Sequence, residues 1–505
     1  MKYRFILIIL FSISFIQYSK QSFQDSLFTK IIEKNESLNI IISPLGIYQL
    51  LSILSNGVEG NTQKEILQIL FSYQKIDDNG ELILNNINNN LFEILTNISN
   101  EETFNLKEKE YEKNLKKSNI SNYFFEPSCI KILNSLFFSM KYKVSNEFSA
   151  FCKKYNTSII EFKNTKEIND LFYDKTNRKI KDILNTKKSD TEFILINAIY
   201  FQGTWYKSFN KEKTKKLPFL NINNDLVEVD TMSNFFKDIM YYKDEKVEMI
   251  SLPYIAKMLK FKMLIILPNQ NKYLSPLNYL KIESINIKDL IPKLKLTKLV
   301  NLFLPKFSYE FGISLNQVLK DMNMKKVFSK EADFSKIFNN NSIKIDDIIH
   351  KTFIKIDEEG SDAADANNII DTYISDNNYQ NPIYMYVNHS FIFTIICDKI
   401  KDSQGNYLIP FIGVVNNLEG NMLNKNKKNN FNNNNKNIRL NLNFEKAYIR
   451  FNYKGNLTKI SASVNLRLNN TNNSIISSSS NNESKIKYNK INKILFTIIF
   501  MIISI

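Results

Sequence analysis

Histidine, cysteine, tryptophan and glycine are all scarce in this chain. Its 505 residues include 2 His, 3 Cys, 1 Trp and 11 Gly. Two histidines exclude a metal site with several His ligands, and three cysteines exclude a dense disulfide framework. So few glycines leave no room for glycine-rich phosphate loops, and neither the GxGxxG nor the GxxxxGK(S/T) pattern occurs. We therefore expect no metal and no cofactor.

The apolar content predicts a large folded protein. Hydrophobic residues make up 43% of the chain, enough for a sizeable core, and the length suits one large domain or two to four ordinary ones. Lys and Arg number 67 against 51 Asp and Glu, which gives a formal charge of +16. Because much of this excess is scattered or lies near the ends of the chain, we expect no nucleic-acid partner.

The N-terminus has the pattern of a secretory signal peptide over residues 1–19. A basic start, Met1–Arg4, precedes the apolar run Phe5–Ile16, which is too short for the roughly 20 residues that span a bilayer. The alternative is a buried N-terminal helix. A signal peptide predicts a secreted or cell-surface glycoprotein. The candidate N-glycosylation sites are Asn35, Asn97, Asn119, Asn156, Asn340, Asn388, Asn456, Asn469, Asn472 and Asn482.

The C-terminus, residues 481–505, has the pattern of a GPI-anchor signal. Small residues that include Ser479 and Ser480 precede a polar spacer, and the apolar run Ile494–Ile505 ends the chain. Ser479 and Ser480 are therefore the candidate lipid-attachment residues. A mismatched membrane span or a packed apolar tail would be the alternatives. We expect membrane contact only through such an anchor.

Two stretches interrupt the mixed helices and strands expected between the ends. Residues 100–127 form a mixed-charge insert, which is interpreted as a solvated loop or a helix extension. Residues 419–480 begin with an Asn/Lys-rich segment that buries too little apolar surface to order itself. Alternating segments follow and predict short strands or a stalk. By contrast, Glu192–Phe201 is continuously apolar and predicts a central strand buried on both faces.

One segment near the end of the main body predicts a strand that leads into a long exposed loop. Alternating residues from Ile354 run into acids and Gly360, then into small residues up to Ala366. Residues 367–382 are polar, without helical or strand periodicity. Taken alone, this composition favours a flexible loop, although its first third has side chains small enough to enter a packed sheet.

The segment Asp357–Ala364 resembles the hinge of the serpin family, and further blocks resemble that family in the same order. The resemblance covers about Ser22 to Leu418. The further blocks are Asn39–Leu45 with Gly60–Thr62, Lys131–Phe137, Ile194–Trp205, Leu252–Tyr254, Met263–Pro268, Leu304–Phe307, Leu315–Met324, Phe328, Ala332–Ser335, His350–Phe353, Asn388–Phe393 and Phe411–Gly413.

The resemblance implies an α+β serpin domain over residues 20–418, with three β-sheets, about nine helices and an exposed reactive loop, 358–385. It implies a monomeric serine protease inhibitor, not an enzyme. In that family a protease attacks the loop as a substrate and forms an acyl-enzyme. The cut loop then inserts as a new strand into the largest sheet and distorts the protease, which is a loop-insertion switch.

The resemblance also implies residue roles in the loop. About fourteen residues past Gly360, the reactive bond would be Ile374–Ser375, which suits an elastase-like or subtilisin-like serine protease. A cut after Tyr373 would suit a chymotrypsin-like one, and nothing basic near the bond favours a trypsin-like target. The implied hinge residues are Glu358, Glu359, Gly360, Ser361, Ala363 and Ala364.

Four residues match the family's positions behind the opening of the sheet. Ser43, Asn197 and His350 resemble its buried polar cluster (the shutter), and Trp205 resembles the position where the loop first enters (the breach). Buried polar groups need partners, so we expect His350 to be structural. Because His389 also lies in a family block, no Ser/His triad is expected.

Some residues depart from the family pattern. On insertion, Asp365 and Asn367 would face the core together with Ser361. Burying a carboxylate costs several kcal/mol, while a new strand could return on the order of 10 kcal/mol. Insertion is therefore allowed but could be slow, and slow insertion makes a substrate. The alternative is a non-inhibitory serpin-fold binding, carrier or surface protein.

Other features are left without an interpretation by the sequence. Gly46 and Arg178 also depart from the family pattern. Cys129, Cys152 and Cys397 are either independent or include one bridged pair.

Overall fold

The computed structural model describes most of the expected serpin domain and little of the tail. The described residues divide between two compact units, residues 1–426 and 427–505. Among them, no helix is long and apolar enough to cross a membrane. The predicted signal peptide, the anchor signal and most of the tail lie outside them. The described residues are 22–71, 80–116, 129–161, 165–184, 191–256, 259–283, 286–338, 343–358, 382–397, 399–403, 405, 407–422, 448–452 and 461–465.

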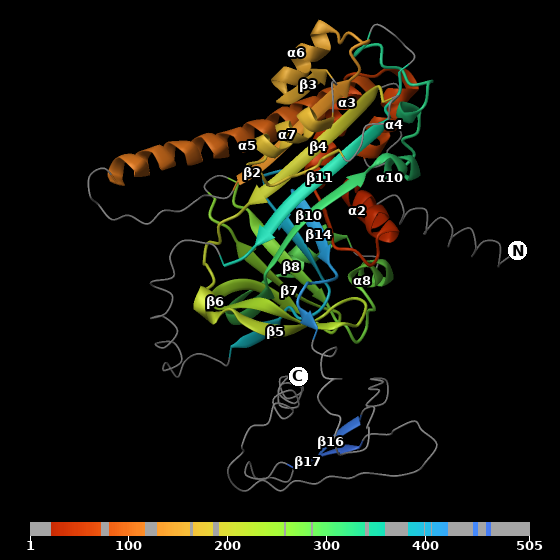
Figure 1. The fold of residues 1–505 in the computed structure, drawn as a ribbon. Coiled ribbons are helices and arrows are strands. Elements are labelled where there is room, and N and C mark those ends of the chain that lie inside the picture. Colours follow the sequence, from red (N-terminus) through yellow and green to blue (C-terminus); the bar gives the residue numbers. More distant parts are fainter. Residues whose placement is uncertain are drawn as a thin grey trace, which may run out of the picture. The chain divides into compact units, whose positions relative to one another are not determined.

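A five-stranded sheet in the first unit contains the predicted central strand. Its order is β10–β11–β4–β2–β3, and β4 runs parallel to its direct neighbour β11 (Figure 1). The strand predicted over Glu192–Phe201 is confirmed as β4. The bounds are β2 Cys129–Phe138, β3 Thr157–Glu161, β4 Phe193–Gln202, β10 Phe307–Ser314 and β11 Asp347–Ile356.

A ten-stranded sheet lies against it and joins two of the expected sheets. Its long strand β6 pairs with β7 over Met240–Lys243 and with β9 from Thr231 onward, so hydrogen bonds run continuously through both. The order is β1–β14–β13–β8–β7–β6–β9–β12, and β5 and β15 also pair with β6. The bounds are β1 Ile40–Ile42, β5 Lys215–Leu220, β6 Leu226–Lys243, β7 Val247–Pro253, β8 Lys262–Pro268, β9 Lys295–Pro305, β12 Ile383–Tyr386, β13 Phe391–Ile396, β14 Phe411–Val415 and β15 Asn421–Met422.

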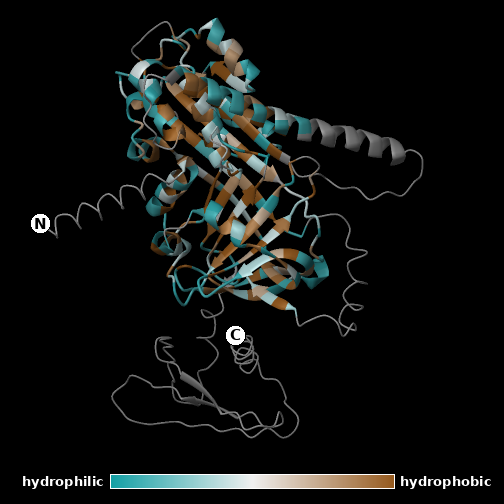
Figure 2. Cartoon of the chain, turned by 180° about the vertical axis from the view of Figure 1, so that it is seen from behind, coloured by the Kyte–Doolittle hydropathy of each residue, from teal (hydrophilic) through white to brown (hydrophobic). Residues whose placement is uncertain are grey.

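Nine α-helices occur in the described part of the chain, which confirms the expected α+β class. Helix α3 is buried along its whole length, and nine of its twelve residues are Leu, Ile, Tyr, Pro or Gly. Figure 2 colours the chain by hydropathy and shows apolar stretches along many helices and strands of this unit. The bounds are α2 Phe23–Lys34, α3 Pro44–Ser55, α4 Gly60–Leu70, α5 Gly80–Lys116, α6 Asn146–Lys154, α7 Thr165–Lys175, α8 Pro276–Glu283, α9 Ile287–Leu290 and α10 Asn316–Asp321.

Helix α5 accounts for most of the predicted insert. Its first part packs on the core through Ile87, Leu91, Ile94 and Ile98, which recur at helical spacing on one face. Residues 100–116 continue the same helix away from the body (Figure 1), so this part is a helix extension. Residues 117–128 lie outside the described part.

The second unit contains one described antiparallel pair, β16 Tyr448–Asn452 with β17 Ser461–Asn465. Both strands fall in the alternating segments for which the sequence predicted short strands.

Candidate functional site

Ser43, Asn197 and His350 lie together in the interior of the first unit. All three are fully buried, and His350 and Asn197 are cross-strand partners on β11 and β4. The backbone N–H of Ser43 donates to His350 Nε2 at 2.9 Å, and His350 Nδ1 lies 2.8 Å from Asn197 Oδ1. Since Nε2 accepts, the ring proton sits on Nδ1 and is donated to Asn197. The three residues therefore connect the start of α3 to the contact between β4 and β11.

The network continues into β2 through Asn134, which lies in the family-like block Lys131–Phe137 and had no predicted role. Asn197 Nδ2 donates to Asn134 Oδ1 at 2.7 Å. Asn134 is the register partner of Asn197 on β2, so the hydrogen bonds cross three adjacent strands. We call Ser43, Asn134, Asn197 and His350 the core network. Its members are all neutral, which suits a region from which water is excluded.

Burial makes His350 a weak base. It lowers the pKa of His350 from the ordinary 6.5 to about 3, so the ring is neutral at neutral pH. Both ring nitrogens already have partners, which leaves none for proton transfer to a substrate. His389 is also held, because its Nε2 lies 2.8 Å from the carbonyl oxygen of Pro268, and burial lowers its pKa.

The structure explains both unusual residues of the sequence. A Cβ atom at Gly46 would stand 2.5 Å from Asn197 Oδ1, so only glycine leaves room for the core network. Arg178 has φ of 61°, the left-handed region where glycine is favoured, in the turn after α7. The family pattern has glycine at this position, and an arginine here adopts the same left-handed conformation at some cost in backbone strain.

Trp205 lies at the end of β4 and holds the chain that follows β11. Its indole Nε1 donates to the carbonyl oxygen of Asp357 at 2.9 Å, and its ring stacks on Tyr254 with centroids 4.3 Å apart. The side chain is 3% exposed. Trp205 therefore contacts the residue from which the expected reactive loop begins.

Glu358, the first residue of the expected hinge, is anchored in the ten-stranded sheet. Its carboxylate lies 2.7 Å from Lys306 Nζ and accepts from Thr214 Oγ1 at 2.5 Å, and its side chain is 4% exposed. Burial alone would raise the pKa of Glu358, but the hydrogen bonds from Lys306 and Thr214 outweigh it and lower the pKa. Lys306 and Thr214 had no assigned role in the sequence analysis.

The other predicted site residues belong to segments beyond the described part of the chain. The remaining hinge residues Glu359, Gly360, Ser361, Ala363 and Ala364, the reactive bond Ile374–Ser375, and the anchor residues Ser479 and Ser480 all lie outside the described residues.

Chain direction limits what can enter between β4 and β11. Both strands run the same way, so a strand that paired with both from between them would run either parallel to both or antiparallel to both. The chain that leaves the C-terminal end of β11 runs antiparallel to both when it folds straight back. Its other end returns in β12, which belongs to the ten-stranded sheet and pairs with β9.

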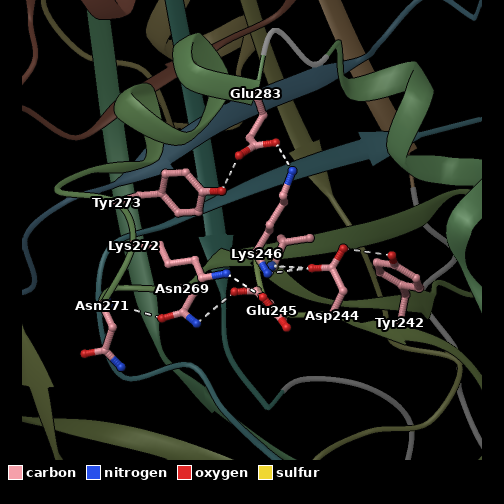
Figure 3. Close-up of polar contacts among 10 residues, drawn as sticks. Tyr242, Asp244, Glu245, Lys246, Asn269, Asn271, Lys272, Tyr273 and Glu283 are labelled. Carbon is pink, nitrogen blue, oxygen red and sulfur yellow. Dashed lines mark hydrogen bonds and ion pairs between the residues drawn. The ribbon is translucent and has the colours of Figure 1, made fainter.

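A second polar cluster lies at the β6–β7 hairpin (Figure 3). Asp244 accepts from the backbone N–H of Lys246 at 2.7 Å and from Tyr242 Oη at 2.8 Å. Lys246 Nζ lies 2.5 Å from Glu283 of α8, which also accepts from Tyr273 Oη at 2.5 Å. We call these five residues the surface network, because Lys246 is half exposed.

Two further observations concern possible metal ligands and cysteines in the described part of the chain. No group of three or more His, Cys, Asp or Glu side chains there is arranged to hold a metal ion. Cys152 and Cys397 are both buried and form no disulfide with each other.

Comparison with known proteins gives one family over most of the chain. A family model described as serpin (serine protease inhibitor) matches residues 18–418. Human serpin B3 is 28% identical over 383 residues, which cover 72% of this chain and 92% of that protein. The leukocyte elastase inhibitor of Xenopus tropicalis is 28% identical over 368 residues, 68% of this chain and 86% of that protein.

Solved structures of other proteins are also similar to this chain. The crystal structure of tengpin, a thermophilic serpin, in its native state covers 80% of this chain and 94% of its own, with 26% identity and a TM-score of 0.59. Thyroxine-binding globulin in complex with thyroxine covers 80% of this chain and 99% of its own, with 21% identity and a TM-score of 0.62, and supports the fold alone.

Proposed function

The chain belongs to the serpin family, and from this premise we propose that it inhibits a serine protease as a suicide substrate, through cleavage and insertion of its reactive loop. Many members of the family inhibit serine proteases and some do not. We further propose that it acts outside the cell as a monomer, secreted or held at the surface by a lipid at Ser479 or Ser480. No cofactor is required.

The observation that carries the proposal is the direct parallel contact between β4 and β11. The contact aligns Asp347 with Ile194 at one end and Ile354 with Phe201 at the other. The loop starts at the end of β11, so its first residues can fold back between the two strands. Insertion would replace this ladder with two new ladders.

The energy balance favours insertion. About ten inserted residues would gain on the order of 10 kcal/mol at about 1 kcal/mol per net hydrogen bond. Asp365 would oppose this by several kcal/mol if its carboxylate entered the core unpaired. Insertion therefore stays downhill, and its rate relative to hydrolysis of the acyl-enzyme decides between inhibitor and substrate.

The first experiment identifies the target class and the cleaved bond. The full chain is incubated with an elastase, a subtilisin and a chymotrypsin, and the products are separated in SDS and analysed by mass spectrometry. We expect an SDS-stable complex with at least one protease and a released peptide that begins at Ser375. Rapid hydrolysis without a complex, and without a rise in thermal stability after cleavage, contradicts the proposal.

A hinge variant provides the matched control. Ala363→Arg places a long cation at a position that must enter the sheet, but it leaves the reactive bond unchanged. We expect cleavage at the same bond with little or no complex. Equal complex formation by both proteins would show that trapping does not depend on insertion.

Asp365 and Asn367 favour the second candidate function, a non-inhibitory binding, carrier or surface protein. Asp365→Ala separates the two candidates. If slow insertion is the only obstacle, this variant forms more complex per cleavage than the natural protein. If neither protein traps any protease, the second candidate stands.

A further inference from the structure

The structure separates the candidate N-glycosylation sites by the surroundings of the asparagine. Asn35 is held, because its Nδ2 donates to the carbonyl oxygen of Ile31 at 2.9 Å. Asn97 lies within helix α5. At Asn388 the required hydroxyl residue, Ser390, is buried and donates to the carbonyl oxygen of Asn416. A glycan on any of these three would disturb a helix or a buried contact.

Asn156 is different. It is exposed, lies in the turn between α6 and β3, and makes no side-chain hydrogen bond to another described residue. Its φ of 52° is left-handed, a conformation that asparagine tolerates well just past a helix end. The required hydroxyl residue, Ser158, is partly buried in β3, and its Oγ accepts a long, exposed hydrogen bond from Lys175 Nζ at 3.4 Å rather than a buried one.

The surroundings of Asn156 show what a glycan there would cover. Strand β3 ends the five-stranded sheet, and in the described part of the chain it pairs only with β2. It is five residues long, and its Ile159 and Ile160 are partly buried against core clusters on opposite faces of the sheet. A free strand edge can pair with another molecule, and proteins commonly block such edges. A hydrated oligosaccharide at the first turn before the strand would do so sterically.

We propose that Asn156 carries an N-linked oligosaccharide that shields the free edge of β3. Asn156 Nδ2 would displace the diphosphate from the anomeric carbon of a lipid-linked oligosaccharide. A nitrogen–carbon bond forms, the carbon–oxygen bond to the diphosphate breaks with its electron pair, and the amide loses one proton. This inference rests on the proposed export of the chain. Loop insertion would not disturb the glycan, because the sheet opens between β4 and β11, on the other side of β2.

The test measures occupancy at Asn156 directly. The full chain is expressed in eukaryotic cells, once with its own residues 1–19 and once with a standard secretory leader in their place. Peptide:N-glycosidase F in heavy-oxygen water converts an occupied asparagine to labelled aspartate, which mass spectrometry locates. We expect label at Asn156 with the standard leader. If the chain secreted with the standard leader carries no label at Asn156, the inference is overturned. If the chain stays inside the cell with its own residues 1–19 but is secreted with the standard leader, only the proposed export is contradicted.

Two variants separate the glycan from the asparagine. Asn156→Gln and Ser158→Ala should each lose one glycan, which is seen as an increase in electrophoretic mobility. Ser158→Ala keeps the asparagine that suits the left-handed turn. Asn35→Gln should not change the mobility. On mild heating we expect both variants to form oligomers several-fold faster than the natural protein, measured by size-exclusion chromatography. Equal rates of oligomer formation in all proteins would overturn the shielding role, whereas the occupancy of Asn156 is judged by the label alone.

Discussion

The core network and the surface network both connect separate elements of the fold, but they use different chemical groups. Each uses hydrogen bonds to connect elements that are distant in the sequence. The core network uses neutral amide, imidazole and backbone groups, all buried. The surface network uses the charged groups of Asp244, Lys246 and Glu283, beside solvent. Charge is expensive in the interior, and at the surface water compensates for it.

The difference matters because only one of the two regions has to open. Insertion of a strand between β4 and β11 would break the hydrogen bond from His350 to Asn197. Neutral partners can separate and be bonded again without moving a charge into the core. The surface network fixes the β6–β7 hairpin to α8, which the proposed mechanism leaves in place. We therefore expect the stability of the protein to depend strongly on the core network and weakly on the surface network.

The largest effect is expected for His350→Ala. It removes a fully buried ring and leaves the Ser43 N–H and Asn197 Oδ1 without partners, at a cost of about 4 to 5 kcal/mol from the cavity and the unpaired groups. Urea unfolding measures the change. A loss below about 1 kcal/mol would mean that the core network does not hold the sheet together.

The second-largest effect is expected for the pH dependence of stability that comes from His350. The folded pKa of His350, about 3, lies below the ordinary 6.5, so the unfolded chain binds the proton first as pH falls. The free energy of unfolding should be unaffected by His350 above pH 6.5 and should fall between 6.5 and 3, on the order of 4 kcal/mol in all. Carboxylates also titrate in this range. The difference between the natural protein and His350→Gln therefore isolates the histidine, and identical pH profiles would contradict the assignment.

A medium effect is expected at the hinge. Glu358→Gln keeps an acceptor for Thr214 but loses the charge pair with Lys306, for a loss of about 2 kcal/mol. A double-mutant cycle with Lys306→Gln measures the coupling between the two side chains. Additive losses would show that the pair contributes nothing. Trp205 is the only tryptophan and bonds to Asp357, so its fluorescence reports on the same region.

The smallest effect is expected for Lys246→Ala in the surface network. The lysine is half exposed, so water screens its ion pair; the loss of stability should be small and should shrink further in high salt. Unfolding at low and high ionic strength tests both statements. A loss as large as that of His350→Ala would remove the contrast between the two networks.

Local sequence pattern was enough for several parts of the molecule. The nearly continuous apolar run of β4 identifies a strand buried on both faces, because it lacks the alternation of polar residues that a solvent-facing side would require. The order of the family-like blocks identified the fold, and the position of His350 in one of those blocks assigned it to the buried polar cluster.

Other features depend on which strands become neighbours. The pairing of Glu358 with Lys306 and Thr214, the fit of Gly46 against Asn197, and the joining of two sheets through β6 all appear only in the folded chain. None of these has a periodic signal in the sequence.

The sequence by itself determined the family, the β4 strand and the buried state of His350, because apolar runs and ordered motifs are local properties of the chain. Only the tertiary structure decided the partners of Glu358, the neutral composition of the core network and the exposure of Asn156. Those depend on strand register and packing between residues that are up to about 300 positions apart, such as Ser43 and His350.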